Sequence, residues 1–296
     1  MVNHASKVDP LMKTPDTCAS PADMCASPAD MCASPADTCM NSAVEVEMTD
    51  VCLQFDANER PVLEHVDLKV SKKEFISIIG RSGSGKSTLL KLAAGLLRPT
   101  RGKVSIAGKC VDEPHEEMAY VFQKPVLLEW RTVLENVLLP IELQRPIVDE
   151  DRKQAVNYLD LVGLGADAHK FPHECSGGMM SRVALARALL VQPRILLMDE
   201  PFAALDTLTK EELQVELARL HQRFEPTIMF VTHDIQEAVY LSDRVFVLGG
   251  QPARIVQALT IPFEHPRSPD LKFSPRFAQL CREIHEKLPR FGSGDR

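Results

Sequence analysis

One short stretch constrains this chain more than any other: Gly80-Arg81-Ser82-Gly83-Ser84-Gly85-Lys86-Ser87-Thr88. It fits the pattern G-x-x-x-x-G-K-[ST] of the phosphate-binding loop, or P-loop. The apolar run 75–79 before it indicates a short buried strand, and the run 89–94 after it indicates a helix. Glycines let the backbone curl its N–H groups around an anion, and the helix N-terminus adds a partial positive charge. We therefore expect a nucleotide site in which Lys86 reaches the β- and γ-phosphates and Ser87 offers its hydroxyl to Mg²⁺.

Composition restricts the class of protein and its surroundings. The chain has 296 residues, 45% of them hydrophobic and 25% charged, which is ordinary for a soluble globular protein with a substantial core. Its net charge of −7, without a long basic block, argues against nucleic acid as the main partner. No apolar run approaches the roughly 18–20 residues that span a bilayer, and the polar N-terminus has no apolar signal core. We expect a cytoplasmic protein whose eight cysteines stay reduced and which meets a membrane only through partner subunits.

Residues 1–43 differ in composition from the rest of the chain. The sequence Cys-Ala-Ser-Pro-Ala-Asp starts at Cys18, Cys25 and Cys32, and Cys39 follows in step. One interpretation is an array of thiols that binds a soft metal or senses oxidants. The other, which we favour, is a disordered tail, because the segment is polar and Pro-rich and its thiols lack the close pairing of zinc sites.

The folded part is predicted to begin near Val44 with a β subdomain. Residues 51–55 and 62–70 indicate strands joined by a turn, and residues 103–108 indicate a further short strand. Phe55, which ends the first of these strands, has two interpretations. Its ring could stack on an adenine base, or it could pack in the core, and the residues alone leave both open.

Strands and helices alternate through most of the remaining chain, which predicts an α/β fold with a mainly parallel core sheet. The predicted strands are 118–122, 194–198, 227–232 and 244–248, and the helices between and around them are 179–190, 209–224 and 236–241. The segment from about 126 to 176 is predicted to be a helical insertion, with helices at 132–144, 149–162 and 166–169. We place the main domain at 44–262, and a C-terminal tail with one helix, 276–288, at 263–296.

Polar residues follow the predicted strands at one edge of this sheet, where ligands of open α/β sheets collect. Asp199 can support the Mg²⁺ shell, and Glu200 can polarise the attacking water as general base, although an Asp-Glu pair also suits the start of a helix. The amide oxygen of Gln123 can reach Mg²⁺ or the water, and His233 can donate to a γ-phosphate. Taken alone, either of these two could be a bystander at a strand end.

Ser176-Gly177-Gly178 precedes a long helix and forms a possible second phosphate cradle, or simply a helix cap and tight turn. The chain thus has two phosphate-binding segments but a single complete hydrolytic set. A head-to-tail homodimer would resolve this, because each cradle would then cover the nucleotide in the P-loop of the other copy.

In this order the motifs resemble the ATP-binding subunits of ABC transporters, over roughly 44–248. Gly80–Thr88 is similar to Walker A, 121–125 to the Q-loop, 175–179 to the signature motif and 195–200 to Walker B, while 204–206 resembles the D-loop and 232–234 the switch histidine. The resemblance implies a P-loop NTPase (RecA-like) core with an N-terminal antiparallel β subdomain, and ATP and Mg²⁺ as cofactors. It implies that Phe55 stacks on adenine, and that Asp206 joins Ser176–Gly178 at the nucleotide of a second copy.

Residues 127–137 and 182–189 look like the importer subgroup for nitrate, sulfonate and taurine. This implies integral membrane permease subunits as partners, a solute-binding protein as an indirect partner, and a peripheral location on the cytoplasmic face of the inner membrane. The sequence departs from the family pattern at four positions, where Cys175 replaces Leu, Met179 and Ser181 replace Gln, and Glu129 replaces Pro. An exporter subunit and an ABC-type ATPase of a non-transport process are the alternative hypotheses, although neither a long coiled coil nor a second cassette is present.

Overall fold

The computed structural model describes residues 44–56 and 60–288. The thiol repeats of segment 1–43, and with them both interpretations of that segment, lie outside the described residues.

The centre of the fold is a six-stranded sheet in the order β10-β9-β3-β8-β7-β6. Strands β9, β3, β8, β7 and β6 are parallel, and β10 pairs antiparallel with β9. All residues of β3, β7 and β8 are buried, as expected of strands covered on both faces. The bounds are β3 (Phe75–Gly80), β6 (Met118–Val121), β7 (Ile195–Asp199), β8 (Thr227–Thr232), β9 (Arg244–Gly249) and β10 (Arg254–Thr260).

A second, antiparallel sheet has the order β2-β1-β4-β5. Its strands are β1 (Val44–Leu53), β2 (Leu63–Ser71), β4 (Arg101–Ile106) and β5 (Lys109–Cys110). β1 begins well before the predicted strand 51–55 and ends before Phe55. Register shifts on both sides of Val51 show that β1 is bulged there, and these bulges hide the simple alternation that a sequence pattern needs.

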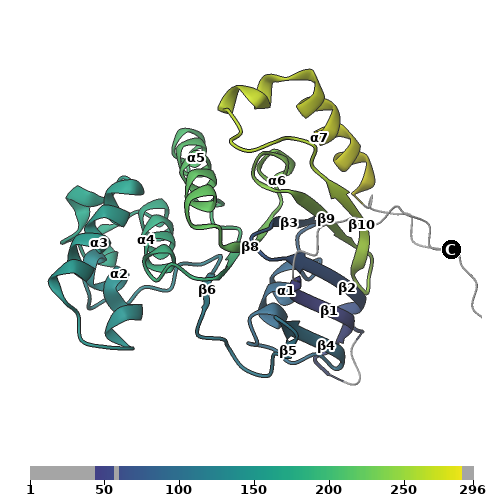
Figure 1. Ribbon diagram of the computed structural model, residues 1–296, viewed down its shortest axis with the longest axis horizontal. Helices are drawn as coiled ribbons and strands as arrows, with labels where there is room; N and C mark the ends of the chain where they lie inside the picture. The colour runs from purple at the N-terminus through teal and green to yellow at the C-terminus, as the bar shows by residue number, and fades with distance from the viewer. Residues whose placement is uncertain (1–43, 57–59, 289–296) are drawn as a thin grey trace, which may run out of the picture. The chain divides into compact units, whose positions relative to one another are not determined.

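The helices are α1 (Lys86–Ala93), α2 (Val133–Glu142), α3 (Asp149–Leu161), α4 (Gly177–Leu190), α5 (Thr207–Phe224), α6 (Ile235–Leu241) and α7 (Pro275–Lys287), with short 3₁₀ turns η1 (Gly165–Asp167), η2 (Pro172–Glu174) and η3 (Pro269–Phe273). Helices α2, α3 and α4 pack together, away from α1 (Figure 1). The start of α2 is fixed by a reciprocal cap, in which Thr132 and Glu135 each bind the backbone N–H of the other. These features agree with the predicted α/β fold, its antiparallel β subdomain and its helical insertion.

The two faces of the parallel sheet belong to two different apolar cores. Along β3, Ile76 and Ile78 face the core shared with α1 and the antiparallel sheet, whereas Phe75 and Ile79 face the core shared with α2–α6. The C-terminal helix α7 joins this second core and contacts α6, burying Phe277, Leu280 and Ile284. The segment after 263 therefore packs on the main fold over its described part.

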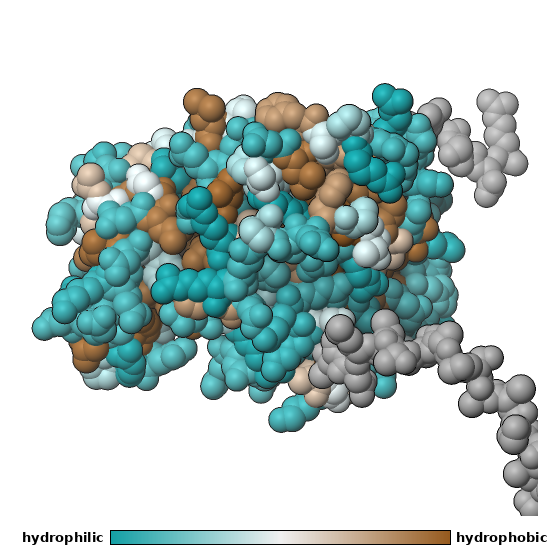
Figure 2. Space-filling view, turned by 45° about the horizontal axis from the view of Figure 1, so that its top comes forward, coloured by the Kyte–Doolittle hydropathy of each residue, from teal (hydrophilic) through white to brown (hydrophobic). Residues whose placement is uncertain are grey.

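Within residues 44–56 and 60–288, no helix is both long and apolar enough to cross a bilayer. Figure 2 shows a face on which polar side chains predominate and apolar ones lie scattered among them.

Candidate nucleotide site

The parallel strands bring the predicted residues to one edge of the sheet, because β3, β6, β7 and β8 end there. β3 ends at Gly80, where a Cβ atom would lie only 2.6 Å from the carbonyl oxygen of Leu248. The loop that follows turns through Gly83 and Gly85, whose φ angles of 75° and 85° are left-handed. α1 begins directly after this turn, so its N-terminal N–H groups face the concave loop.

Lys86 is buried in this loop, with 5% of its side chain exposed. Its ammonium donates hydrogen bonds of 3.0 Å to the carbonyl oxygens of Gly80 and Arg81, and lies 3.8 Å from Glu200 Oε1. Burial lowers the pKa of Lys86, and the carboxylates of Glu200 and Asp199 counteract this. The loop thus holds the buried ammonium of Lys86 close to two acids, where phosphate oxygens would enter.

Ser87 and Asp199 present two oxygen donors beside Lys86. Ser87 Oγ donates to Asp199 Oδ1 at 2.9 Å, and Asp199 itself is only 4% exposed. Burial raises the pKa of Asp199, and the hydrogen bond from Ser87 opposes that rise. A hydroxyl and a carboxylate are oxygen ligands of the kind that Mg²⁺ prefers, so the donor set fits that ion.

The carboxylate of Glu200 lies beside polar side chains from several elements of the site. Its backbone is left-handed, with φ of 47°, and its N–H donates to Val231 O at 2.9 Å. Its Oε2 atom lies 3.2 Å from His233 Nδ1 and 3.4 Å from Gln123 Nε2. The ends of β6 and β8 therefore each bring a polar side chain to the Glu200 carboxylate, which lies at the end of β7.

The remaining P-loop residues lie at the surface of this edge, and Phe55, after the end of β1, is also at the surface of the protein. Arg81, Ser82 and Gly83 are exposed, and Ser84, Gly85 and Thr88 are half-buried. A pocket beside Gly83 and Ser84 is lined by residues 60–62 and 250–253. The side chain of Phe55 is 62% exposed, which excludes the alternative that it packs in the core.

The structure does not place the second phosphate-binding segment beside the P-loop. Ser176 caps α4, its Oγ accepting from Met179 N at 3.2 Å, and Gly177 and Gly178 form the first helical turn. The closest neighbours of a Cβ on Gly178 would be Ala204 O and a Leu205 methyl, at 3.2 and 3.3 Å. Asp206 in turn caps α5. Residues 176–178 therefore contact the turn before α5. They are not beside the nucleotide loop, since Figure 1 shows α4 well apart from α1.

Comparison with known proteins decides the family. The family model described as ABC transporter matches residues 63–203. The chain is 44% identical to the nitrate import ATP-binding protein NrtD of Synechococcus elongatus, over 77% of this chain and 85% of that protein. The chain belongs to the ABC transporter family, as one of its ATPases. The predicted resemblance, including the nitrate importer subgroup, is confirmed.

Two further comparisons agree with this assignment. The bicarbonate transport ATP-binding protein CmpD of Synechocystis sp. is also 44% identical to this ABC ATPase, over 74% of this chain and 79% of that protein. The dimeric ATP-binding cassette MJ0796, solved in a post-hydrolysis state with ADP and phosphate, has a TM-score of 0.68 at 32% identity. The match covers 74% of this chain and all of that one, and it confirms the predicted fold.

Sequence reasoning missed two residues near the site of this ABC ATPase. Tyr120 on β6 has its pKa raised well above the ordinary value, mainly by burial and further by the nearby Asp199 carboxylate. Lys210 on α5 lies 2.8 Å from Asp234 Oδ2 and 2.6 Å from Glu237 Oε1. A tyrosine in an apolar strand and a lysine on an amphipathic helix are typical of a core and a solvated face, so neither pattern signals a site.

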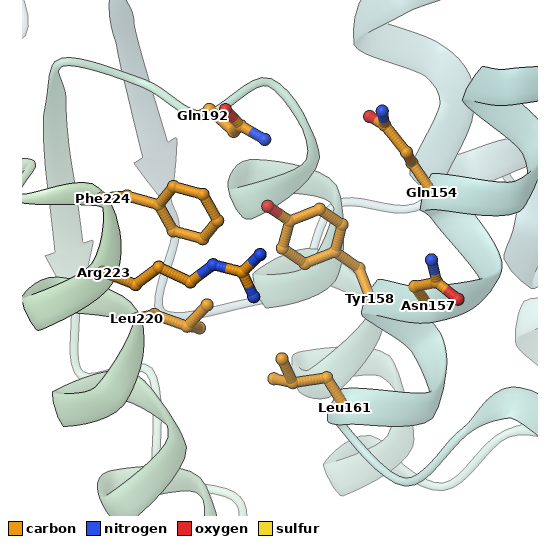
Figure 3. A pocket seen from close by; sticks show the side chains of 8 residues that line it. All are labelled: Gln154, Asn157, Tyr158, Leu161, Gln192, Leu220, Arg223 and Phe224. Carbon is orange, nitrogen blue, oxygen red and sulfur yellow. The ribbon is translucent and has the colours of Figure 1, made fainter.

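A pocket of this ABC ATPase lies outside the P-loop edge, between α3 and α5 (Figure 3). Tyr158 and Arg223 extend into it from opposite sides. Burial raises the pKa of Tyr158, and a hydrogen bond with Gln192 and the charge of Arg223 oppose this rise. The other lining residues are Gln154, Asn157, Leu161, Leu220 and Phe224, and none of them was predicted as a site residue.

Proposed function

We propose that this ABC ATPase is the ATP-hydrolysing subunit of an importer and drives uptake of a small solute through partner membrane permeases. The observation that carries the proposal is the convergence of Lys86, Gln123 and His233 on the Glu200 carboxylate. A general base beside a buried phosphate-binding lysine is what ATP hydrolysis requires, and binding alone would not need it.

In this proposal the residues have separate roles. Glu200 takes a proton from the attacking water, while Gln123 orients that water and His233 donates to the γ-phosphate. Lys86 and the backbone of the P-loop hold the β- and γ-phosphates, and Phe55 offers an exposed ring to the adenine.

Mg²⁺ would be held by Ser87 and Asp199, and the amide oxygen of Gln123 would be a further ligand. The ion would neutralise the charge of the phosphates and fix their orientation. The pairing of Ser87 with Asp199 already places both oxygens on one side of the loop, which supports this assignment.

The second copy would complete each site. Ser176 and Gly177 are exposed, and the first turn of α4 leaves N–H groups that can bind the γ-phosphate of another copy. Asp206, next to this turn through Ala204 and Leu205, would face the same nucleotide. The dimeric state of the MJ0796 cassette supports this arrangement.

The surface offered to the permease would lie on the helical insertion and the segment leading to it. Val126, Trp130 and Leu143 expose 61%, 74% and 78% of their surface, which is unusual for apolar residues of this size. This surface would hold the ATPase at the cytoplasmic face of the inner membrane, as a peripheral subunit.

The relatives NrtD and CmpD are named for nitrate and bicarbonate, both small anions. We therefore expect a small anionic or zwitterionic solute of the nitrate, sulfonate or taurine type, delivered by a solute-binding protein. The test is reconstitution of the ATPase with its permease subunits and binding protein in vesicles, with uptake of nitrate, bicarbonate and sulfonates measured. ATP-dependent uptake that Glu200→Gln abolishes is the expected result, whereas ATP-driven efflux, or no transport by an active ATPase, would contradict an import role.

A further inference from the structure

A cluster of three possible metal ligands lies on the antiparallel sheet, outside the nucleotide site. Asp50 and Cys52 are on β1, and His65 is on the neighbouring strand β2. One ligand atom from each of these side chains lies within 4.8 Å of the other two. We propose that Asp50, Cys52 and His65 form a binding site for a divalent transition-metal ion, with zinc as the type example.

The separations between the ligand atoms are close to those of a zinc site. His65 Nδ1 lies 2.5 Å from Asp50 Oδ1, and the three ligand atoms all lie within 4.8 Å of one another. Cys52 Sγ also accepts a hydrogen bond of 3.4 Å from the backbone N–H of His65, which holds the sulfur beside that residue. Ligands bound at about 2.0–2.3 Å from a tetrahedral zinc are roughly 3.3–3.7 Å apart. The imidazole and carboxylate must therefore separate by about 1 Å, and the thiol must approach them by at most about 1 Å, which side-chain rotation at a half-exposed surface allows.

Arg101 on β4 orients the carboxylate of this cluster. Its guanidinium lies 3.0 Å from Asp50 Oδ2, so the other oxygen, Oδ1, remains directed at His65. Carboxylates that bind metals are themselves held by such outer hydrogen bonds. The side chain of Arg101 is 67% exposed, so water screens its repulsion of a bound cation.

The backbone around the cluster is locally strained. Asp50 and His65 have φ angles of 50° and 48°, in the left-handed region that non-glycine residues seldom adopt. The register of β1 against β2 also shifts on both sides of Val51. The bulged strand pairing and the hydrogen bond of 2.9 Å from Asp50 N to Asp67 Oδ1 help to hold these conformations, and a metal bound across the two strands would offset more of their cost.

The ligand types distinguish this site from the magnesium site. Asp50, Cys52 and His65 supply one oxygen, one sulfur and one nitrogen, which suits zinc, cobalt or nickel and is poor for Mg²⁺ or Ca²⁺. On binding, the proton of the Cys52 thiol and the proton shared by His65 and Asp50 are released to solvent while the sulfur, nitrogen and oxygen bind the ion, so binding weakens as the pH falls. The bound ion would link β1 to β2 and stabilise the antiparallel sheet.

The proposal is tested on the full chain by thermal unfolding with and without added ZnCl₂, and by the absorption spectrum with CoCl₂. At a saturating zinc concentration the wild type should gain about 5 °C in Tm. Cobalt should produce a thiolate charge-transfer band and the visible bands of a tetrahedral ion. The variants Cys52→Ser and His65→Gln should lose the zinc-dependent gain in Tm while unfolding normally without metal.

Cys110→Ser is the matched control, because Cys110 is an exposed thiol of the same sheet. It should keep both the gain in Tm and the cobalt spectrum. Thiols of segment 1–43 can bind metal as well, and the full chain keeps them in every variant, so only a difference between variants counts. An equal gain in Tm in wild type, Cys52→Ser and His65→Gln, or no gain in the wild type, would overturn the proposal.

Discussion

The P-loop edge of the parallel sheet and the first turn of α4 are the two segments that we propose bind phosphate, and they are built in different ways. At the P-loop edge, Lys86 and Asp199 are almost fully buried, and Glu200 already has three polar neighbours. At the start of α4, Ser176 is exposed and its hydroxyl only caps its own helix.

The two halves of the site therefore differ in how much free energy it costs to form them. Burying charges at the P-loop edge lowers the stability of the chain, and the nearly fully buried strands of the sheet hold those charges in place. The start of α4 needs no such support, because its N–H groups remain hydrated until another surface covers them. One half is therefore organised by the fold of a single chain, and in the proposed dimer the other half would be organised by association.

The substitution Glu200→Gln should cause the largest loss at the P-loop edge. We expect kcat for ATP hydrolysis to fall about 10²–10⁴-fold, because Gln cannot accept the proton of the attacking water. Equilibrium binding of ATP should persist, since the groups that hold the phosphates are unchanged. Phosphate release and nucleotide binding measure the two effects, with Glu212→Gln on the exposed face of α5 as the control. Steady-state hydrolysis at the wild-type rate would remove Glu200 as the base.

Ser176→Arg should inactivate the other half, lowering kcat at least about 10-fold because the larger side chain blocks the contact of the α4 turn with the γ-phosphate in the one site that this turn covers. Binding of ATP to the separate chain should be unaffected. The sharper experiment mixes Ser176→Arg with Lys86→Ala, since each mixed dimer has one site built from two intact halves. Random pairing should restore about a quarter of the wild-type rate. If the mixture stays as inactive as its components, the two halves of a site do not come from different chains.

Lys210→Met should lower kcat by about 10-fold with little change in KM. Burial would lower the pKa of Lys210, but its hydrogen bonds to Asp234 and Glu237 raise it, so it stays charged and holds the residues after His233. His233 would then lose its fixed position relative to Glu200. Lys210→Arg should recover most of the rate, whereas equal losses in both variants would indicate a purely structural effect.

The smallest effect should appear in acid, in the helical insertion that carries Ser176. Asp151 on α3 binds Arg145 through both oxygens at 2.7 Å, and this pair lowers the pKa of Asp151 to about 2. Since that pKa is below the ordinary 3.8, the pair stabilises the fold above about pH 4, and this stabilisation is lost as the pH falls toward 2.

The variant Asp151→Asn should therefore show a shallower decline of Tm between pH 4 and pH 2 than the wild type. Asp149→Asn, at the start of the same helix, serves as the control and should decline like the wild type. Parallel declines in all three proteins would show that Asp151 does not hold the insertion in acid.

Much of the P-loop edge could be predicted because its polar residues come directly after the ends of apolar strands. Asp199 and His233 each follow an apolar run, and parallel strands bring such positions together without further information. The strand β10 was not predicted, because Gly249-Gly250 and Pro252 before it are typical of a loop and its residues are only partly buried.

Other features depend on contacts between distant segments, which one sequence does not record. In the sequence, Lys210 looks like any polar residue of a helix. Its contact with Asp234 exists only because α5 packs beside α6. Likewise, Asp50 and His65 are unremarkable in the sequence, and only the bulged pairing of β1 with β2 places them together.

The left-handed backbone of Glu200 has a consequence for protein engineering. A conformation of this kind costs of order 1 kcal/mol for a residue with a side chain, and glycine adopts it freely. A laboratory selection for heat resistance alone would therefore favour glycine at position 200 and enrich inactive chains. Programmes to make this ATPase more robust should exclude that position from their libraries, since its strain belongs to its activity.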